Sequence, residues 1–132
     1  MSQENVEIVR RIYAEVSEQK ALPAEFFAPD CVTDWTDVSP DFNQLRGIDA
    51  AQKALAPYFE TFDDFHVEIR DIVQADGHRL VTALRDGGRI RGSGAEVWNH
   101  YFHAWTFRGR KVIWLSSHTN RDDALRAVGL AE

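Results

Sequence analysis

Several residue types and segment types are scarce in this sequence. It contains one cysteine, Cys31, one methionine and four prolines among 132 residues. A single cysteine excludes an intramolecular disulfide and a cysteine-rich zinc site. No apolar run approaches the roughly eighteen residues of a membrane span, and the opening MSQENVEIVRR has no apolar core of signal-peptide length. We therefore expect a cytoplasmic protein that makes no contact with a membrane.

Positive charge is also in short supply. The chain has 15 Lys and Arg against 21 Asp and Glu, which gives a net charge of -6. This balance argues against a general affinity for nucleic acid or anionic lipid. The length suits one domain, 1–132, large enough to bury a core without a metal or disulfide.

Motifs for cofactors and metals are missing as well. No glycine-rich phosphate loop follows a predicted strand and opens a helix, and no nucleophile elbow is present. His66, His78 and His100 have no spacing that forms a ligand set with carboxylates. We expect no cofactor and no metal, with Cys31 as a small buried core residue.

Apolar periodicity predicts three helices in the first half of the chain. The first is expected from Ser2 to about Lys20, where apolar residues recur at three- and four-residue steps. A second, short helix is predicted over 22–28. A third is predicted from Ala50 to about Phe62, with Asp49 as its N-cap and with Pro57 kinking or breaking it.

Strand patterns dominate the rest. A short strand is predicted at 31–35, followed by a long loop over 36–47 of the kind that often forms a lid or site wall. Alternating segments beyond residue 64 slip in phase near Asp71, as at a β-bulge, and Asp76-Gly77 marks a hairpin. Asn120 can cap a last short helix. Helices followed by hairpin-linked strands predict an α+β fold with an antiparallel-rich sheet.

The segment WNHYFHAWTF, residues 98–107, is dense in aromatic side chains. In a strand its side chains alternate between two faces. One face would carry Asn99, Tyr101, His103, Trp105 and Phe107, and the other Trp98, His100, Phe102, Ala104 and Thr106. We interpret the first face as the floor of a functional site and the second as facing a helix or a partner chain.

Five segments together resemble the SnoaL-like branch of the NTF2-like superfamily: MSQENVEIVRRIYAEV, FFAPDCVTDW, RGIDAA, FHAWTFRGRKV and NRDDALRAVGL. The superfamily contains ketosteroid isomerases, polyketide cyclases, ligand carriers and dimerisation modules. The resemblance implies an NTF2-like cone, in which N-terminal helices pack on a strongly curved, mostly antiparallel mixed sheet that encloses a pocket. It also implies a homodimer packed through the sheet.

The resemblance suggests roles for individual residues. His103 lies where ketosteroid isomerases carry the protonated acid of the oxyanion hole. Ungapped matching places the isomerase base on Trp35, next to Asp34, and the oxyanion tyrosine on Ile12, next to Tyr13. The isomerase triad is therefore not intact.

We predict His103 as a general acid or hydrogen-bond donor to a substrate carbonyl, and Asp34 as the acid/base residue. Asp37 is the other candidate, and partial desolvation by Trp35 and Phe42 would raise the pKa of a carboxylate at either position. Seven residues are predicted to bind ligand: Tyr13, Trp35, Tyr58, Asn99, Tyr101, Trp105 and His118. The alternative is a hydrogen-bonded core role for His103 and a solvated loop position for Asp37 and Asp41.

Our leading functional hypothesis is a cofactor-independent protein whose aromatic pocket binds a small apolar, carbonyl-bearing or polycyclic compound. Isomerase or cyclase chemistry by acid/base catalysis would run through His103 and Asp34. The alternative is a ligand-binding or dimerisation module without turnover.

Overall fold

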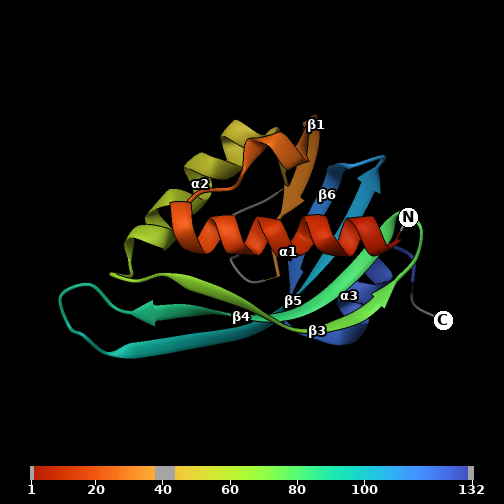
Figure 1. The fold of residues 1–132 in the computed structure, drawn as a ribbon. Coiled ribbons are helices and arrows are strands. Elements are labelled where there is room, and N and C mark those ends of the chain that lie inside the picture. Colours follow the sequence, from red (N-terminus) through yellow and green to blue (C-terminus); the bar gives the residue numbers. More distant parts are fainter. Residues whose placement is uncertain (1, 38–43, 131–132) are drawn as a thin grey trace.

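The computed structural model describes residues 2–37 and 44–130, which form an α+β cone (Figure 1). Its six-stranded sheet has the order β2-β1-β6-β5-β4-β3, and β1 and β6 are paired in parallel. The elements are α1 (Ser2–Gln19), the 3₁₀ turn η1 (Ala24–Phe26), β1 (Phe27–Asp34), β2 (Gln44–Arg46), α2 (Ile48–Glu60), β3 (His66–Ala75), β4 (Arg79–Arg89), β5 (Glu96–Arg108), β6 (Lys111–His118) and α3 (Arg121–Ala127).

The sheet separates two apolar clusters. Helices α1 and α2 cover its concave face, where the larger cluster includes Ile12, Phe65, Leu84, Trp105 and Leu115. Helix α3 packs on the opposite face, over a small cluster formed by Val81, Ala104, Ala124 and Val128. The strand directions change strongly across the sheet, so that β1 and β6 lie at a steep angle to β3 and β4 (Figure 1). This curvature leaves room between the helices and the concave face.

The predicted first helix is confirmed as α1, and its apolar residues Val9, Ile12, Tyr13 and Val16 are buried. The predicted helix over 22–28 is wrong. Only one 3₁₀ turn forms there before β1 begins, and a hydrogen bond from the Phe26 N–H to the carbonyl oxygen of Pro23 closes it. None of the helices in the described ranges is long and apolar enough to cross a membrane.

Three details of the segment from residue 36 to residue 62 differ from expectation. Residues 44–46 pair with β1 as β2, whereas positions 38–43 of the predicted loop lie outside the described residues. Helix α2 begins after Gly47, not Asp49, and it runs through Pro57 without a break. Leu55 and Phe59, which are both buried, flank Pro57, and their packing offsets the one hydrogen bond that proline cannot make.

The strand and turn predictions for the second half are confirmed. The register between β3 and β4 shifts at Ile69/Asp71, where a bulge was predicted, and Asp76-Gly77 turns the chain between these strands. The Asn120 side chain caps α3 by accepting a hydrogen bond from the Asp123 N–H at 2.9 Å.

Gly87 gives a test of the pairing between β4 and β5. A Cβ atom there would lie 1.9 Å from the carbonyl oxygen of Val97, on a backbone with φ of +149°. We therefore expect Gly87→Ala to lower the free energy of unfolding by about 1–3 kcal/mol, measured by urea denaturation. Gly77→Ala is the matched control, because nothing lies within 4 Å of its added methyl group. Equal stability of the two variants would contradict this account.

Candidate functional site

A cavity of about 530 Å³ lies between the helices and the concave face of the sheet. Its apolar walls come from α1, α2, β3, the residue before β3 and β6, and include Ile12, Val16, Leu55, Phe59, Phe65, Val67 and Leu115. Polar side chains also line it, including Asp86 of β4 and several residues of β5. A cavity of this size and composition fits a small organic molecule.

Four of the five residues predicted as the floor of the site line the cavity; Phe107 does not, whereas His100, expected on the other face, does. Asn99, Tyr101, His103 and Trp105 of β5 all line the cavity. They are joined by residues of β4 through the antiparallel register, in which Thr82 pairs with His103, Leu84 with Tyr101 and Asp86 with Asn99. Directly paired residues project on the same face of a sheet, so Asp86 and Thr82 are brought beside the β5 row.

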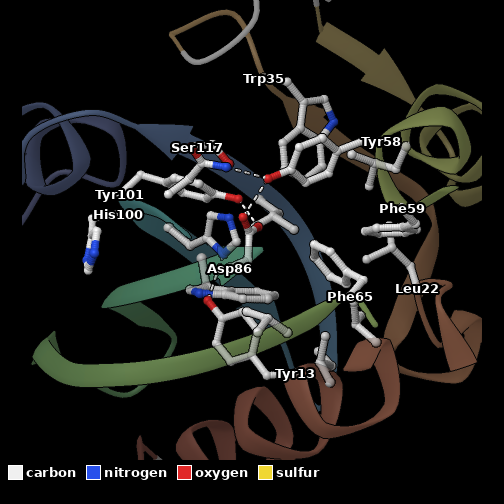
Figure 2. Close-up of a pocket in the computed structure, with 18 of the residues that line it drawn as sticks. Tyr13, Leu22, Trp35, Tyr58, Phe59, Phe65, Asp86, His100, Tyr101 and Ser117 are labelled. Atoms are coloured by element: carbon white, nitrogen blue, oxygen red, sulfur yellow. Dashed lines mark hydrogen bonds between the residues drawn. The ribbon is translucent and has the colours of Figure 1, made fainter. Parts of the chain in front are cut away.

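Asp86 is the centre of the first polar cluster. Its carboxylate accepts a hydrogen bond from the Tyr58 hydroxyl at 2.6 Å and another from the Tyr101 hydroxyl. The Asn99 amide donates in turn to the Tyr58 oxygen at 2.9 Å. Figure 2 shows Tyr58 and Tyr101 converging on the carboxylate from two sides. Helix α2 and strands β4 and β5 thus meet at one buried acid.

The cluster holds an acid with an elevated pKa. Asp86 is only 4% exposed, and burial raises its pKa, against the opposing effect of the hydrogen bonds from Tyr101 and Tyr58. Burial also raises the pKa of both tyrosines, and the nearby Asp86 charge adds to the effect. Both phenols therefore stay protonated and serve as donors, while Asp86 has the more easily exchanged proton.

His103 is the centre of the second polar cluster. Its Nδ1 lies 2.7 Å from the Tyr13 hydroxyl, which lies 2.8 Å from Oγ1 of Thr82. The indole N–H of Trp105 donates to the same Thr82 oxygen at 3.2 Å. The Tyr13 ring stacks on the imidazole, and Trp35 meets it edge-on. Tyr13, beside the position that resemblance assigned to the oxyanion tyrosine, is thus the phenol that reaches His103.

His103 is 7% exposed, and burial lowers its pKa to about 3, so the imidazole is neutral near pH 7. Within the described residues, Nε2 of His103 and Oγ of Ser117 are buried without a hydrogen-bond partner, and both residues line the cavity. Buried polar atoms in native proteins are almost always paired. These two atoms are therefore the natural contact points for a bound molecule.

Asp34 lies apart from this site. It is not among the residues that line the cavity, and its carboxylate accepts hydrogen bonds from the Thr36 N–H at 3.0 Å and from the Gln44 amide at 3.3 Å. Burial acts to raise the pKa of Asp34, but the hydrogen bonds from Thr36 and Gln44 outweigh it and lower the pKa. The expectation of a raised pKa at this position is therefore wrong.

The other predicted residues divide into two groups. Tyr13, Trp35 and Tyr58 line the cavity, as does Asp37, whereas His118 is not among the lining residues. His118 bonds Asp37 through Nδ1 at 2.6 Å and Ser116 through Nε2 at 2.7 Å. It therefore orients one lining residue instead of facing the cavity itself. The solvated position expected for Asp41 lies outside the described residues.

Asp86 and Ser117 are among the lining residues that the sequence predictions do not include. A signal for Asp86 was present, because Leu80, Thr82, Leu84 and Asp86 recur at every second position and place a carboxylate on an otherwise uncharged, buried strand face. No group of three or more His, Cys, Asp or Glu side chains is arranged to hold a metal ion in the described part of the chain.

Comparisons with known structures agree with this fold. The chain is similar to AclR, a candidate hydroxylase from Streptomyces galilaeus, with a TM-score of 0.76 and 17% identity over 100% of this chain and 89% of that one. It is also similar to a candidate SnoaL-like polyketide cyclase from Jannaschia sp. CCS1, with a TM-score of 0.69 and 23% identity over 98% and 92% of the two chains.

A third similar structure is a hypothetical protein with a ketosteroid isomerase-like fold from Catenulispora acidiphila, in complex with trimethylamine. Its TM-score is 0.71, with 18% identity over 94% of this chain and 93% of that one. These likenesses establish an NTF2-like cone. The model of the SnoaL-like domain matches residues 9–114, and the chain therefore belongs to the SnoaL-like family. No curated protein matches the sequence.

Proposed function

We propose that the cavity binds a small, largely apolar compound that carries a carbonyl group or a polycyclic ring system. The observation that carries this proposal is the buried carboxylate of Asp86 in a cavity with apolar walls. An acid with a raised pKa in such a site is suited to removing a proton from carbon next to a carbonyl and returning it elsewhere. The reaction would be an isomerisation or a cyclisation that needs no cofactor.

In this proposal His103 stabilises the negative charge that develops on the carbonyl oxygen, as a neutral hydrogen-bond donor. Asp86 takes the acid/base role for which the sequence suggested Asp34, because Asp86 borders the cavity and Asp34 does not. Support for the ligand class comes from relatives of the same fold, one described as a candidate polyketide cyclase and another, TerC, co-crystallised with polyporic acid.

A panel of steroids, polyketides and terpenoids tests the binding. We expect at least one class to raise the melting temperature, since a ligand at about 100 times its Kd stabilises the native state by about 2.7 kcal/mol. Leu55→Trp, which fills the cavity from α2, should remove the shift. Catalysis is then tested in D₂O by deuterium uptake next to the ligand carbonyl, followed by NMR. Binding without deuterium uptake would favour the alternative of a ligand carrier.

A homodimer through the sheet and a cytoplasmic location are further parts of the proposal. The convex face carries Phe102 and Trp114, which are half-buried and pack against the small cluster beneath α3. These side chains are the ones through which a second copy would pack on the sheet.

A further inference from the structure

We propose that His103 Nε2–H and Ser117 Oγ–H together form an oxygen-binding subsite, and that Trp105, Thr82 and Tyr13 fix the tautomer that makes His103 a donor. We call the first pair the oxygen subsite and the three supporting residues the donor relay. The ligand class, a compound with a carbonyl oxygen, rests on the proposed function, whereas the tautomer does not.

The donor relay has a direction because its first member can only donate. An indole N–H has no acceptor atom, so the Trp105 bond at 3.2 Å must end on a lone pair of the Thr82 oxygen. The hydroxyl hydrogen of Thr82 then remains to be placed. The Tyr13 oxygen, 2.8 Å away, is the other side-chain partner of this hydroxyl among the described residues.

If Thr82 donates to Tyr13, the Tyr13 hydrogen is directed to Nδ1 of His103 at 2.7 Å. Each hydroxyl hydrogen then has an acceptor. In the reverse direction Tyr13 donates to Thr82. The hydroxyl hydrogen of Thr82 is then buried and has no acceptor among these side chains. A buried polar group without a hydrogen-bond partner lowers stability by about 1–3 kcal/mol, so the first arrangement is favoured.

The tautomer follows from this direction. A neutral imidazole has one N–H, and Nδ1 is occupied as an acceptor from Tyr13. The hydrogen of His103 therefore lies on Nε2, the buried ring nitrogen that has no partner in the described chain. The cavity is thus presented with an N–H donor at this point.

Ser117 supplies the second donor. It is the direct partner of His103 across the β5–β6 register, so the two side chains project side by side from one face of the sheet. Ser117 is 1% exposed and borders the cavity, and its hydroxyl likewise lacks a partner among the described residues. Two adjacent unmet donors suit one carbonyl oxygen, which has two lone pairs.

The tautomer is tested without any ligand. In protein labelled with ¹⁵N-histidine, two-bond ¹H–¹⁵N correlation at pH 7 should show the His103 hydrogen on Nε2, with the signals assigned by their loss in His103→Gln. Thr82→Ser should retain this tautomer, and Thr82→Val should give a mixture with Nδ1–H. A wild-type hydrogen on Nδ1, or an unchanged single tautomer in Thr82→Val, would overturn the donor relay.

The oxygen subsite is tested with 1-tetralone and tetralin, two bicyclic probes that differ in one carbonyl group. Titration followed by tryptophan fluorescence should show 1-tetralone binding roughly tenfold more tightly, the equivalent of one hydrogen bond. Ser117→Ala should lose most of this preference. Ser116→Ala is the matched control, because that hydroxyl bonds Trp114 and His118 instead of lining the cavity.

The possible failures are distinguishable. Equal affinity of the wild type for the two probes would overturn the oxygen subsite. Failure of both probes to bind would contradict the ligand class and the proposed function together, while the tautomer measurement would still decide the donor relay.

Discussion

Acidification from pH 6.5 to pH 4 is expected to lower the free energy of unfolding by up to about 3 kcal/mol through His103 alone. Burial lowers the pKa of His103 from 6.5 to about 3. In this pH range the unfolded chain therefore binds a proton that the folded protein excludes. Stability is complete above pH 6.5 and is lost as the pH falls, at no more than about 1.4 kcal/mol per pH unit.

Urea denaturation at intervals of pH measures this slope. In His103→Gln the titrating group is absent, and the curve should flatten between pH 6.5 and pH 4. His100→Gln is the control, since it removes an exposed histidine from the same strand. An unchanged slope in His103→Gln would show that another group is responsible.

Asp86→Asn is expected to reduce proton exchange or turnover of a bound carbonyl compound by about 10²–10⁴-fold, the usual contribution of a positioned general base. The amide cannot accept a proton from the ligand, although its oxygen can still receive a hydrogen bond from Tyr58 or Tyr101. Deuterium incorporation under saturating ligand measures the loss.

Asp34→Asn is the matched control, because it removes the same charge from a carboxylate outside the cavity. It also tests the first assignment made from the sequence. Loss of exchange in Asp34→Asn with full exchange in Asp86→Asn would restore Asp34 to the mechanism.

The pH dependence of stability should also change in Asp86→Asn. The folded pKa of Asp86 is raised above the ordinary 3.8, so the folded protein binds this proton more tightly than the unfolded chain does. Stability from Asp86 is therefore lost as the pH rises above 3.8. In Asp86→Asn this loss of stability with rising pH should disappear, as measured by urea denaturation at intervals of pH, and a wild-type slope in the variant would contradict it.

Much of the fold could be predicted from local pattern. Helix α1 and strand β5 have strong periods of 3.6 and 2, and these periods decide which side chains are buried. The errors occur where pairing with distant segments decides the structure. Phe27 extends β1 because it pairs with Val112, and Gln44–Arg46 becomes a strand because β1 lies beside it. A local window contains neither partner.

The site shows the same division. Alternation along β5 was enough to place His103 and Tyr101 on the cavity floor. The role of Asp86 cannot be predicted from a local pattern, because it depends on the strand register. The register places Asp86 opposite Asn99 and within hydrogen-bond distance of Tyr58 from α2. Asp34 lies next to the position that the resemblance matches to the isomerase base, and this match does not reveal the hydrogen bonds from Thr36 and Gln44 that hold its carboxylate outside the cavity.

The parallel pairing of β1 with β6 bears on how the protein folds. This pairing brings together the first and the last strand, which are far apart in the sequence. Closing so long a loop costs conformational entropy, and that cost is offset only when the chain between the two strands is already ordered. We expect this contact to form late. Because Trp35 follows β1 and Ser117 belongs to β6, the cavity is completed only in that step. A ligand should therefore slow unfolding and leave the early folding rate almost unchanged.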